Sequence, residues 1–129
     1  MERDVLIDSN FFISRLRRGV DPFLELARQQ GDTLFYCCGV VKAEVCRGIS
    51  QQRLLQRVTR GFEVMCWVPT TDKVWDRVVS MAWAASRRGE TAQITDLIIA
   101  ASALEIGAAV LTTDSDFRRF PGLEVLDDL

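Results

Sequence analysis

The stretch from Val5 to Asn10 constrains the fold more than any other part of this sequence. Three consecutive apolar residues, Val5-Leu6-Ile7, predict a short strand buried on both faces, as in a parallel sheet covered by helices. The run ends at Asp8, and Ser9-Asn10 are residues typical of turns and helix caps. A carboxylate therefore stands where a buried strand becomes a helix, at the edge where open α/β sheets bind ligands. Taken alone, Asp8 is equally well interpreted as a simple helix cap.

The rest of the chain alternates predicted helices and strands, which is typical of an α/β fold with a parallel sheet covered on both sides. The length of 129 residues fits one domain, so residues 1–129 are predicted to form a single domain. We expect Ser50 to cap one helix and Gly107 to end another. The predicted strands are 5–7, 34–38, 63–68, 108–112 and 123–126. The predicted helices are 11–18, 22–30, 40–49, 51–61, 72–88 and 94–107, with a short helix or turn at 114–120.

The chain contains no histidine, and this excludes several kinds of chemistry. It removes the usual general base and the Ser-His and Cys-His nucleophile pairs. The four cysteines show no Cys-x-x-Cys spacing, so a zinc site is not expected. Adjacent Cys37 and Cys38 are interpreted as buried thiols rather than as a disulfide. Any catalysis must therefore use carboxylates, a metal ion, or both.

Charge and hydropathy narrow the class of protein further. The 16 basic and 18 acidic residues give a net charge of −2, which argues against holding nucleic acid by bulk charge alone. No apolar run reaches the roughly 18 to 20 residues of a membrane span, and the run after the charged N-terminus is too short for a signal peptide. We therefore expect a cytoplasmic protein with no membrane contact.

Three further acids, Glu44, Asp96 and Asp114, occupy positions that would bring them near Asp8. Asp114 follows a predicted strand as Asp8 does, so neighbouring strands would place both acids at one edge. Glu44 and Asp96 lie on predicted helices that could flank this edge. Each also has an ordinary interpretation: Glu44 as a surface partner of Arg47, and Asp96 as a first-turn acid that complements the helix dipole.

Four carboxylates gathered at one edge repel one another unless a proton or a cation neutralises them. With no histidine or cysteine beside them, the cations that fit are hard ones, Mg²⁺ or Mn²⁺. Such sites typically hydrolyse phosphodiesters, because the metal activates a water and shields charge in the transition state. Asp116 lies two residues after Asp114, and one of these two acids is also a candidate cap for a short helix around Phe117.

Four segments, in order and over essentially the whole chain, resemble the sequence motifs of PIN-domain ribonucleases. They are Asp8-Ser9-Asn10, Val40–Gly48, Asp96–Gly107, and Leu111–Phe117 followed by Pro121-Gly122-Leu123. The chain length and the Ile-Ala-Ala and Asp-Phe details are most similar to the VapC toxins of bacterial and archaeal toxin–antitoxin pairs.

This resemblance implies a three-layer PIN-like fold with a five-stranded parallel sheet of order 3-2-1-4-5. It implies an endoribonuclease dependent on Mg²⁺ or Mn²⁺, with RNA as its substrate. It also implies a homodimer that a small VapB-like antitoxin inhibits. By the motif match, the metal and catalytic residues are Asp8, Glu44, Asp96 and Asp114. The supporting polar residues are Ser9, Asn10 and Thr112, and Asp116 is the weaker fit to the fourth acid.

Two other functions stay open from the sequence. One is a PIN nuclease for routine RNA processing or decay without an antitoxin, and the other is a PIN fold that binds without catalysis. The helices at 21–30 and 50–61 carry apolar residues beyond one core face, which favours contact with a partner chain. Arg15, Arg17 and Arg18 are interpreted as solvated charge, with RNA or antitoxin contacts as the alternatives.

Overall fold

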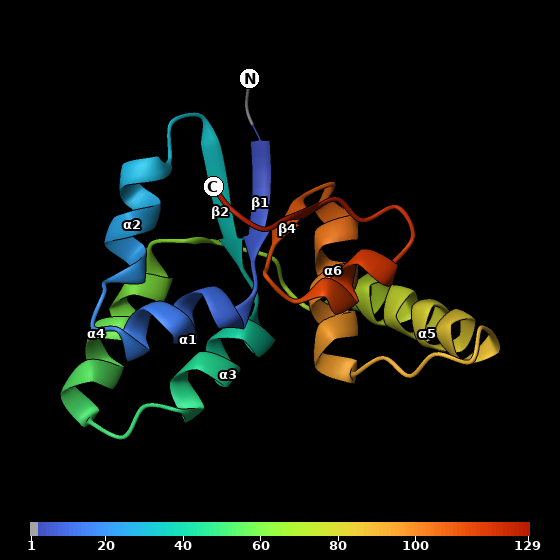
Figure 1. The fold of residues 1–129 in the computed structure, drawn as a ribbon, viewed down its shortest axis with the longest axis horizontal. Helices are drawn as coiled ribbons and strands as arrows, with labels where there is room; N and C mark the ends of the chain where they lie inside the picture. Colours follow the sequence, from blue (N-terminus) through green and yellow to red (C-terminus); the bar gives the residue numbers. More distant parts are fainter. Residues whose placement is uncertain (1–2) are drawn as a thin grey trace.

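The fold is built on one parallel sheet, shown in Figure 1 for the computed structural model, which describes residues 3–129. Five strands run in the order β3-β2-β1-β4-β5, and each neighbouring pair is parallel. This confirms the predicted α/β class and strand order. The strands are β1 (Arg3–Ile7), β2 (Thr33–Cys37), β3 (Cys66–Trp67), β4 (Ala109–Leu111) and β5 (Val125–Leu126). The helices are α1 (Ser9–Arg17), α2 (Pro22–Gln29), α3 (Gly39–Arg47), α4 (Gln52–Glu63), α5 (Asp72–Arg87) and α6 (Ile94–Ile106), with a 3-10 helix, η1 (Ser115–Arg119).

Helices cover the sheet on both sides, with α1, α2 and α4 to the left of the strands in Figure 1 and α5 and α6 to the right. The centre of the sheet is β1, in which Val5, Leu6 and Ile7 are buried. α6 is buried from residue 97 to residue 103, because it is apolar all round and packs between α5 and the strands β1 and β4. Gly107 ends α6 with a φ of 68°, in the left-handed region, as the sequence predicts.

Three phenylalanines join α1, α2 and α4. The ring centroids of Phe12 and Phe62 lie 4.9 Å apart, and that of Phe23 lies 5.5 Å from Phe12 and 5.1 Å from Phe62. Gly61 lets α2 approach α4 closely, because a Cβ at this position would overlap the Phe23 ring. The contact between these two helices therefore depends on a residue without a side chain.

We expect Gly61→Ala to destabilise the protein by about 1–3 kcal/mol, the usual cost of overpacking, although alanine favours helices over glycine. Gly39→Ala is the matched control, since Gly39 also lies in a helix and a Cβ there meets no atom within 4 Å. The control should match wild type or exceed its stability by up to about 1 kcal/mol. Urea unfolding measures all three proteins, and equal stabilities of the two variants would contradict the role given to Gly61.

The structure differs from the sequence prediction around residues 50–68. α4 continues to Glu63, so the strand predicted at 63–68 is wrong in its first half, and β3 pairs with β2 only through Cys66 and Trp67. The fully buried Phe62 packs against two other rings, and this packing holds the last turn of α4 in helical form. The predicted cap at Ser50 is also wrong, because Gln51 is the N-cap residue and its side chain makes no capping hydrogen bond.

The structure also tests what the sequence predicts for the cysteines, for the start of α1 and for membrane-spanning helices. Cys37 and Cys38 are buried free thiols, as predicted. α1 begins at Ser9, two residues before the predicted start, because Asp8 serves as its N-cap. Among residues 3–129, no helix is both long enough and apolar enough to cross a bilayer.

Candidate functional site

The ends of β1 and β4 define one edge of the sheet. Ile7 of β1 pairs with Leu111 of β4, and the Asp8 N–H donates to the Leu111 carbonyl at 3.0 Å. Asp8 and Thr112 are therefore the first residues beyond two adjacent strands, at the carboxyl edge where parallel sheets bind ligands. α1, α3 and α6 all begin beside this edge, in the lower half of Figure 1.

Asp8 is buried, with 5% of its surface exposed, and neutral groups hold its carboxylate. Oδ2 accepts a hydrogen bond from Thr112 Oγ1 at 2.8 Å, and Oδ1 accepts one from the Ser9 N–H at 2.7 Å. Burial raises the pKa of Asp8, these two hydrogen bonds lower it, and the charges of Glu44 and Asp114 raise it further. Asp8 also caps α1, so the cap and the site involve the same side chain.

Thr112 connects Asp8 to the loop that follows β4. Its Oγ1 donates to Asp8 and accepts from the Asp114 N–H at 3.0 Å and from Asn10 Nδ2 at 3.2 Å. Ser9 adds a longer contact, from its Oγ to Asp8 Oδ1 at 3.4 Å. This hydrogen-bonded group fixes the orientation of the Asp8 carboxylate. That Ser9, Asn10 and Thr112 support a metal site stays a prediction.

Asp96, Asp114 and Asp116 come together at the same edge. Each of the three offers a carboxylate oxygen, and these oxygens all lie within 4.8 Å of one another. Asp96 lies in the first turn of α6, whereas Asp114 caps η1 by accepting from the Asp116 N–H at 2.9 Å. Burial raises the pKa of Asp96 to about 6, and the charges of Asp8, Asp114, Glu44 and Asp116 add to the rise.

Glu44 lies on α3, outside the group of three but within electrostatic reach of it. Its charge raises the pKa of both Asp8 and Asp96. Its carboxylate forms no ion pair with Arg47 or with any other cation in the described part of the chain, residues 3–129. The alternative interpretation of Glu44 as a surface partner of Arg47 therefore fails.

The acids at this edge have little compensating positive charge. Within residues 3–129, Asp8, Asp96 and Asp114 also form no ion pair, while Asp116 lies 3.8 Å from Arg119. Uncompensated carboxylates and only oxygen donors are the combination that fits a hard divalent cation. Because Asp116 already has a cation beside it, Asp114 is the better candidate for the fourth acid.

Sequence reasoning missed two neighbours of this edge. Cys38 is buried directly before α3, and burial, with the charges of Asp8 and Glu44, raises the pKa of its thiol. In the sequence, Cys38 lies just before the predicted helix that carries Glu44, and this position could have indicated that Cys38 lies near the site. Thr113 accepts a hydrogen bond from Asn10 Nδ2 at 3.3 Å, and no sequence motif indicated this contact.

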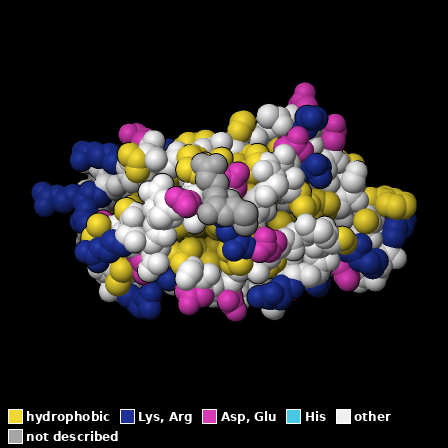
Figure 2. Space-filling view, turned by 90° about the horizontal axis from the view of Figure 1, so that it is seen from above, with side chains coloured by type: hydrophobic (Ala, Val, Ile, Leu, Met, Phe, Trp, Pro, Cys, Tyr) yellow, Lys and Arg dark blue, Asp and Glu magenta, His cyan; other side chains and the backbone are white. Residues whose placement is uncertain are grey.

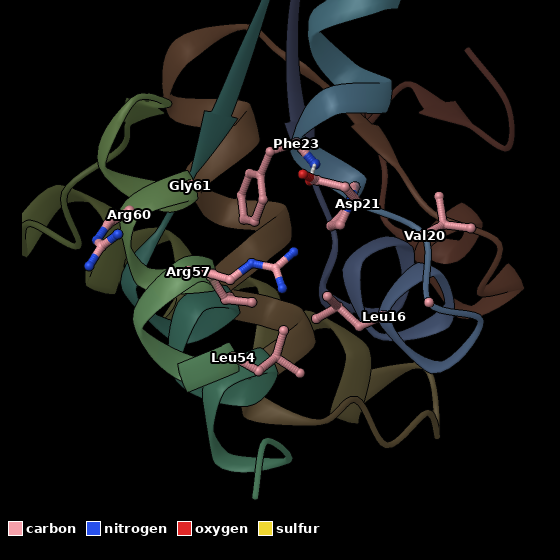
Figure 3. A pocket seen from close by; sticks show the side chains of 11 residues that line it. Leu16, Val20, Asp21, Phe23, Leu54, Arg57, Arg60 and Gly61 are labelled. Atoms are coloured by element: carbon pink, nitrogen blue, oxygen red, sulfur yellow. Dashed lines mark hydrogen bonds between the residues drawn. The ribbon is translucent and has the colours of Figure 1, made fainter. Parts of the chain in front are cut away.

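A second feature is an apolar pocket of about 390 Å³ between the end of α1, the start of α2, and α4 (Figure 3). Leu16, Val20 and Leu54 supply much of its lining. In Figure 3 the Arg57 side chain extends across the pocket, whereas Arg60 points away from it. The helices expected to offer apolar residues to a partner thus form a concave surface whose charged lining residues are Asp21, Arg57 and Arg60.

Comparisons with known proteins place this geometry in a family. The sequence profile of the PIN domain matches residues 5–123, so the chain belongs to the PIN domain family. A search of curated protein sequences gives no match.

Solved structures share the fold at low sequence identity. A chain of VapBC2 from Rickettsia felis, bound to a DNA fragment from their promoter, aligns with a TM-score of 0.82 and 16% identity, over 95% of this chain and 97% of that one. A chain of DNA-bound VapBC from Salmonella typhimurium gives 0.81 and 17%, over 96% and 97%. Mycobacterium tuberculosis VapC20, a sarcin-ricin loop cleaving toxin, gives 0.64 and 12%, over 90% and 95%. The fold is thus that of a VapC-like PIN domain.

Proposed function

We propose that this protein is a metal-dependent endoribonuclease of the VapC toxin type, with Asp8, Glu44, Asp96 and Asp114 as its metal-binding and catalytic residues. The observation that carries the proposal is a group of acids with little compensating positive charge at the carboxyl edge of a PIN-domain sheet. Asp96 and Asp114 come together there with Asp116, and the charges of Asp8 and Glu44 reach Asp96. A bound Mg²⁺ or Mn²⁺ would supply an activated water and positive charge beside the reacting phosphate. One PIN domain spanning residues 1–129 suffices for this chemistry.

The chain's own residues orient the ligands before any substrate arrives. Thr112 and the Ser9 N–H hold the two carboxylate oxygens of Asp8, and Asn10 holds Thr112. Such hydrogen bonds to ligating groups fix their geometry and typically affect metal affinity or activity 10- to 100-fold. A non-catalytic binding module would have no need for a buried Asp8 carboxylate beside less buried carboxylates that repel it.

A toxin role is favoured over routine RNA processing by the fold and by the apolar pocket. The aligned structures from Rickettsia felis and Salmonella typhimurium are complexes of toxin–antitoxin pairs. The pocket of Figure 3 suits a segment of a VapB-like antitoxin with apolar side chains and an acidic group for Arg57. A toxin that acts on cellular RNA belongs in the cytoplasm.

The direct test of the proposed activity is incubation of RNA with the purified protein in Mg²⁺ or Mn²⁺. We expect fragments with a 5′-phosphate and a 3′-hydroxyl. Sequencing of the fragment ends would at the same time identify the RNA target. An absence of cleavage of any cellular RNA would contradict the proposal.

A homodimer is the second part of the proposal, and the outer face of α5 supports it. Trp75, Val79 and Trp83 follow one another at intervals of one helical turn and are 43%, 67% and 64% exposed. Asp72 lies at the start of this face and Arg87 at its end. In an antiparallel pair of α5 helices, the acidic start of one helix would lie against the basic end of the other.

We expect Val79→Asp to convert the dimer into a monomer of 14.6 kDa without loss of the fold, because this side chain is mostly exposed. A charge in the middle of an apolar interface costs several kcal/mol when it has no partner. Ser80→Asp is the control, since Ser80 is exposed about 100° further round the same helix. Light scattering gives the mass of each protein. A monomeric wild type, or dissociation of both variants alike, would contradict this interface.

A further inference from the structure

A groove of about 500 Å³ runs between α1 and the turn that joins α3 to α4. Its charged lining residues are Glu44, Arg17 and Arg47. The other side chains in its wall are aliphatic, hydroxyl or amide groups, and none is aromatic. The groove thus includes Glu44, whose charge acts on Asp8 and Asp96, and the positive charges in its lining are two guanidinium groups.

Both guanidinium groups are available to a ligand. Arg17 and Arg47 are exposed, and neither forms an ion pair within the described residues 3–129. Arg15, on the same helix as Arg17, is different: its Nε lies 2.9 Å from Glu25 and its guanidinium lies over the Phe11 ring. The interpretation as solvated charge is therefore wrong for Arg15, which is paired and half-buried, whereas it fits the exposed Arg17.

The groove lies in the basic part of an otherwise acidic chain. Residues 15–60 contain nine of the sixteen basic residues but only four of the eighteen acidic ones. Figure 2, seen from above, shows Lys and Arg side chains at the left end of the molecule, where Figure 1 places α2 and α4; the groove lies lower in Figure 1, outside this view. Although the net charge of the whole chain is negative, the part formed by residues 15–60 is basic and is suited to bind a polyanion.

We propose that this groove binds the sugar-phosphate backbone of single-stranded RNA next to the cleaved bond, with Arg17 and Arg47 contacting phosphates. The inference rests on the proposed ribonuclease function and assigns substrate-binding residues to it. When one phosphate of the RNA lies at the acidic edge, the next phosphate lies one nucleotide away. The groove, which includes Glu44, would place this next phosphate near Arg17 and Arg47. Guanidinium groups match the geometry of phosphate oxygens.

The lining of the groove favours RNA over an antitoxin segment. The groove is lined by two arginines and no aromatic ring, whereas the lining of the pocket in Figure 3 includes Pro22 and Phe23. With no aromatic ring on which bases could stack, contacts here are to the backbone and carry no sequence preference. Because the pocket and the groove share Leu16 and Leu54, an antitoxin segment in the pocket would end beside the RNA path.

The test compares steady-state RNA cleavage by wild type and by the double variant Arg17→Gln/Arg47→Gln, in Mn²⁺, at several salt concentrations. Two RNAs of unrelated sequence are used. We expect KM to rise about tenfold on both RNAs with kcat within about twofold, since lost backbone contacts weaken substrate and transition state alike. The slope of log kcat/KM against log salt should become shallower by about 1.4, or 0.7 for each phosphate contact.

The control is Arg28→Gln/Lys73→Gln, which removes two exposed basic residues outside the groove and should leave KM and the salt slope unchanged. A double variant with wild-type KM and salt slope overturns the inference while the ribonuclease function stands. Wild-type KM combined with lost inhibition by a co-expressed antitoxin also overturns it, and assigns the groove to the antitoxin. If wild type itself neither cleaves nor binds RNA, the proposed function fails and the inference fails with it.

Discussion

Asp8→Asn is expected to reduce RNA cleavage to less than about one-hundredth of the wild-type rate, since even the partners of metal ligands are typically worth 10- to 100-fold. Asn preserves the size of Asp8 and still accepts from the Ser9 N–H, but it lacks the negative oxygen that a metal requires. In the metal-free protein the change removes a buried charge that Glu44 and Asp114 repel. The free energy of unfolding in EDTA at neutral pH should therefore equal or exceed that of wild type.

Asp21→Asn is the matched control for this variant. Asp21 also caps a helix, accepting from the N–H groups of Phe23 and Leu24 at 2.9 and 3.2 Å, but it is exposed and lies at the start of α2. Because Asn caps as well as Asp, cleavage and stability should not change. If Asp8→Asn behaves like this control, Asp8 is only a helix cap and the metal site loses its central ligand.

In EDTA, the melting temperature is expected to fall as pH rises from about 4 to about 7. The pKa of Asp96 is about 6 in the folded state, whereas the ordinary pKa of an aspartate, 3.8, applies to the unfolded chain. Between these values the folded state binds more protons than the unfolded state, so stability is lost as pH rises through this window. Asp8, whose pKa is also raised, contributes in the same direction.

Saturating Mn²⁺ should reverse this trend, because the ion binds ionised carboxylates and only in the folded state. At a concentration of 100 times its Kd, the ion stabilises the fold by about 2.7 kcal/mol, which raises Tm by roughly 8 °C in a domain of this size. Asp96→Asn should flatten the pH dependence in EDTA and lose most of the Mn²⁺ effect. A wild-type Tm that is independent of pH and of Mn²⁺ would contradict the proposed site.

The sequence predicted the acidic edge because it depends on local patterns. An apolar run such as Val5-Leu6-Ile7 is typical of a strand buried on both faces, and the polar residue that ends it then lies at the edge of the sheet. Asp114 follows β4 in the same way. Pairing of β1 with β4 then brings Asp8 and the Asp114 loop together, and the prediction needed this non-local step as well as the placement of Glu44 and Asp96 beside the same edge.

The parts that sequence could not predict depend on side-chain packing across the fold. The end of α4 is set by contact of Phe62 with Phe12 and Phe23, which are distant in sequence. The groove with Arg17 and Arg47 exists because α1 lies beside the turn after α3, and no motif encodes that approach. The hydrogen bond between Asn10 and Thr113 likewise joins residues 103 positions apart.

The most direct test of the account is a Mn²⁺ titration of the wild-type protein with two readouts, the rate of RNA cleavage and the melting temperature. We expect no cleavage in excess EDTA. As Mn²⁺ is added, the two readouts should rise over the same range of concentration, because metal binding at the acidic edge is responsible for both. Undiminished cleavage in EDTA, or cleavage that saturates without any rise in Tm, would contradict it.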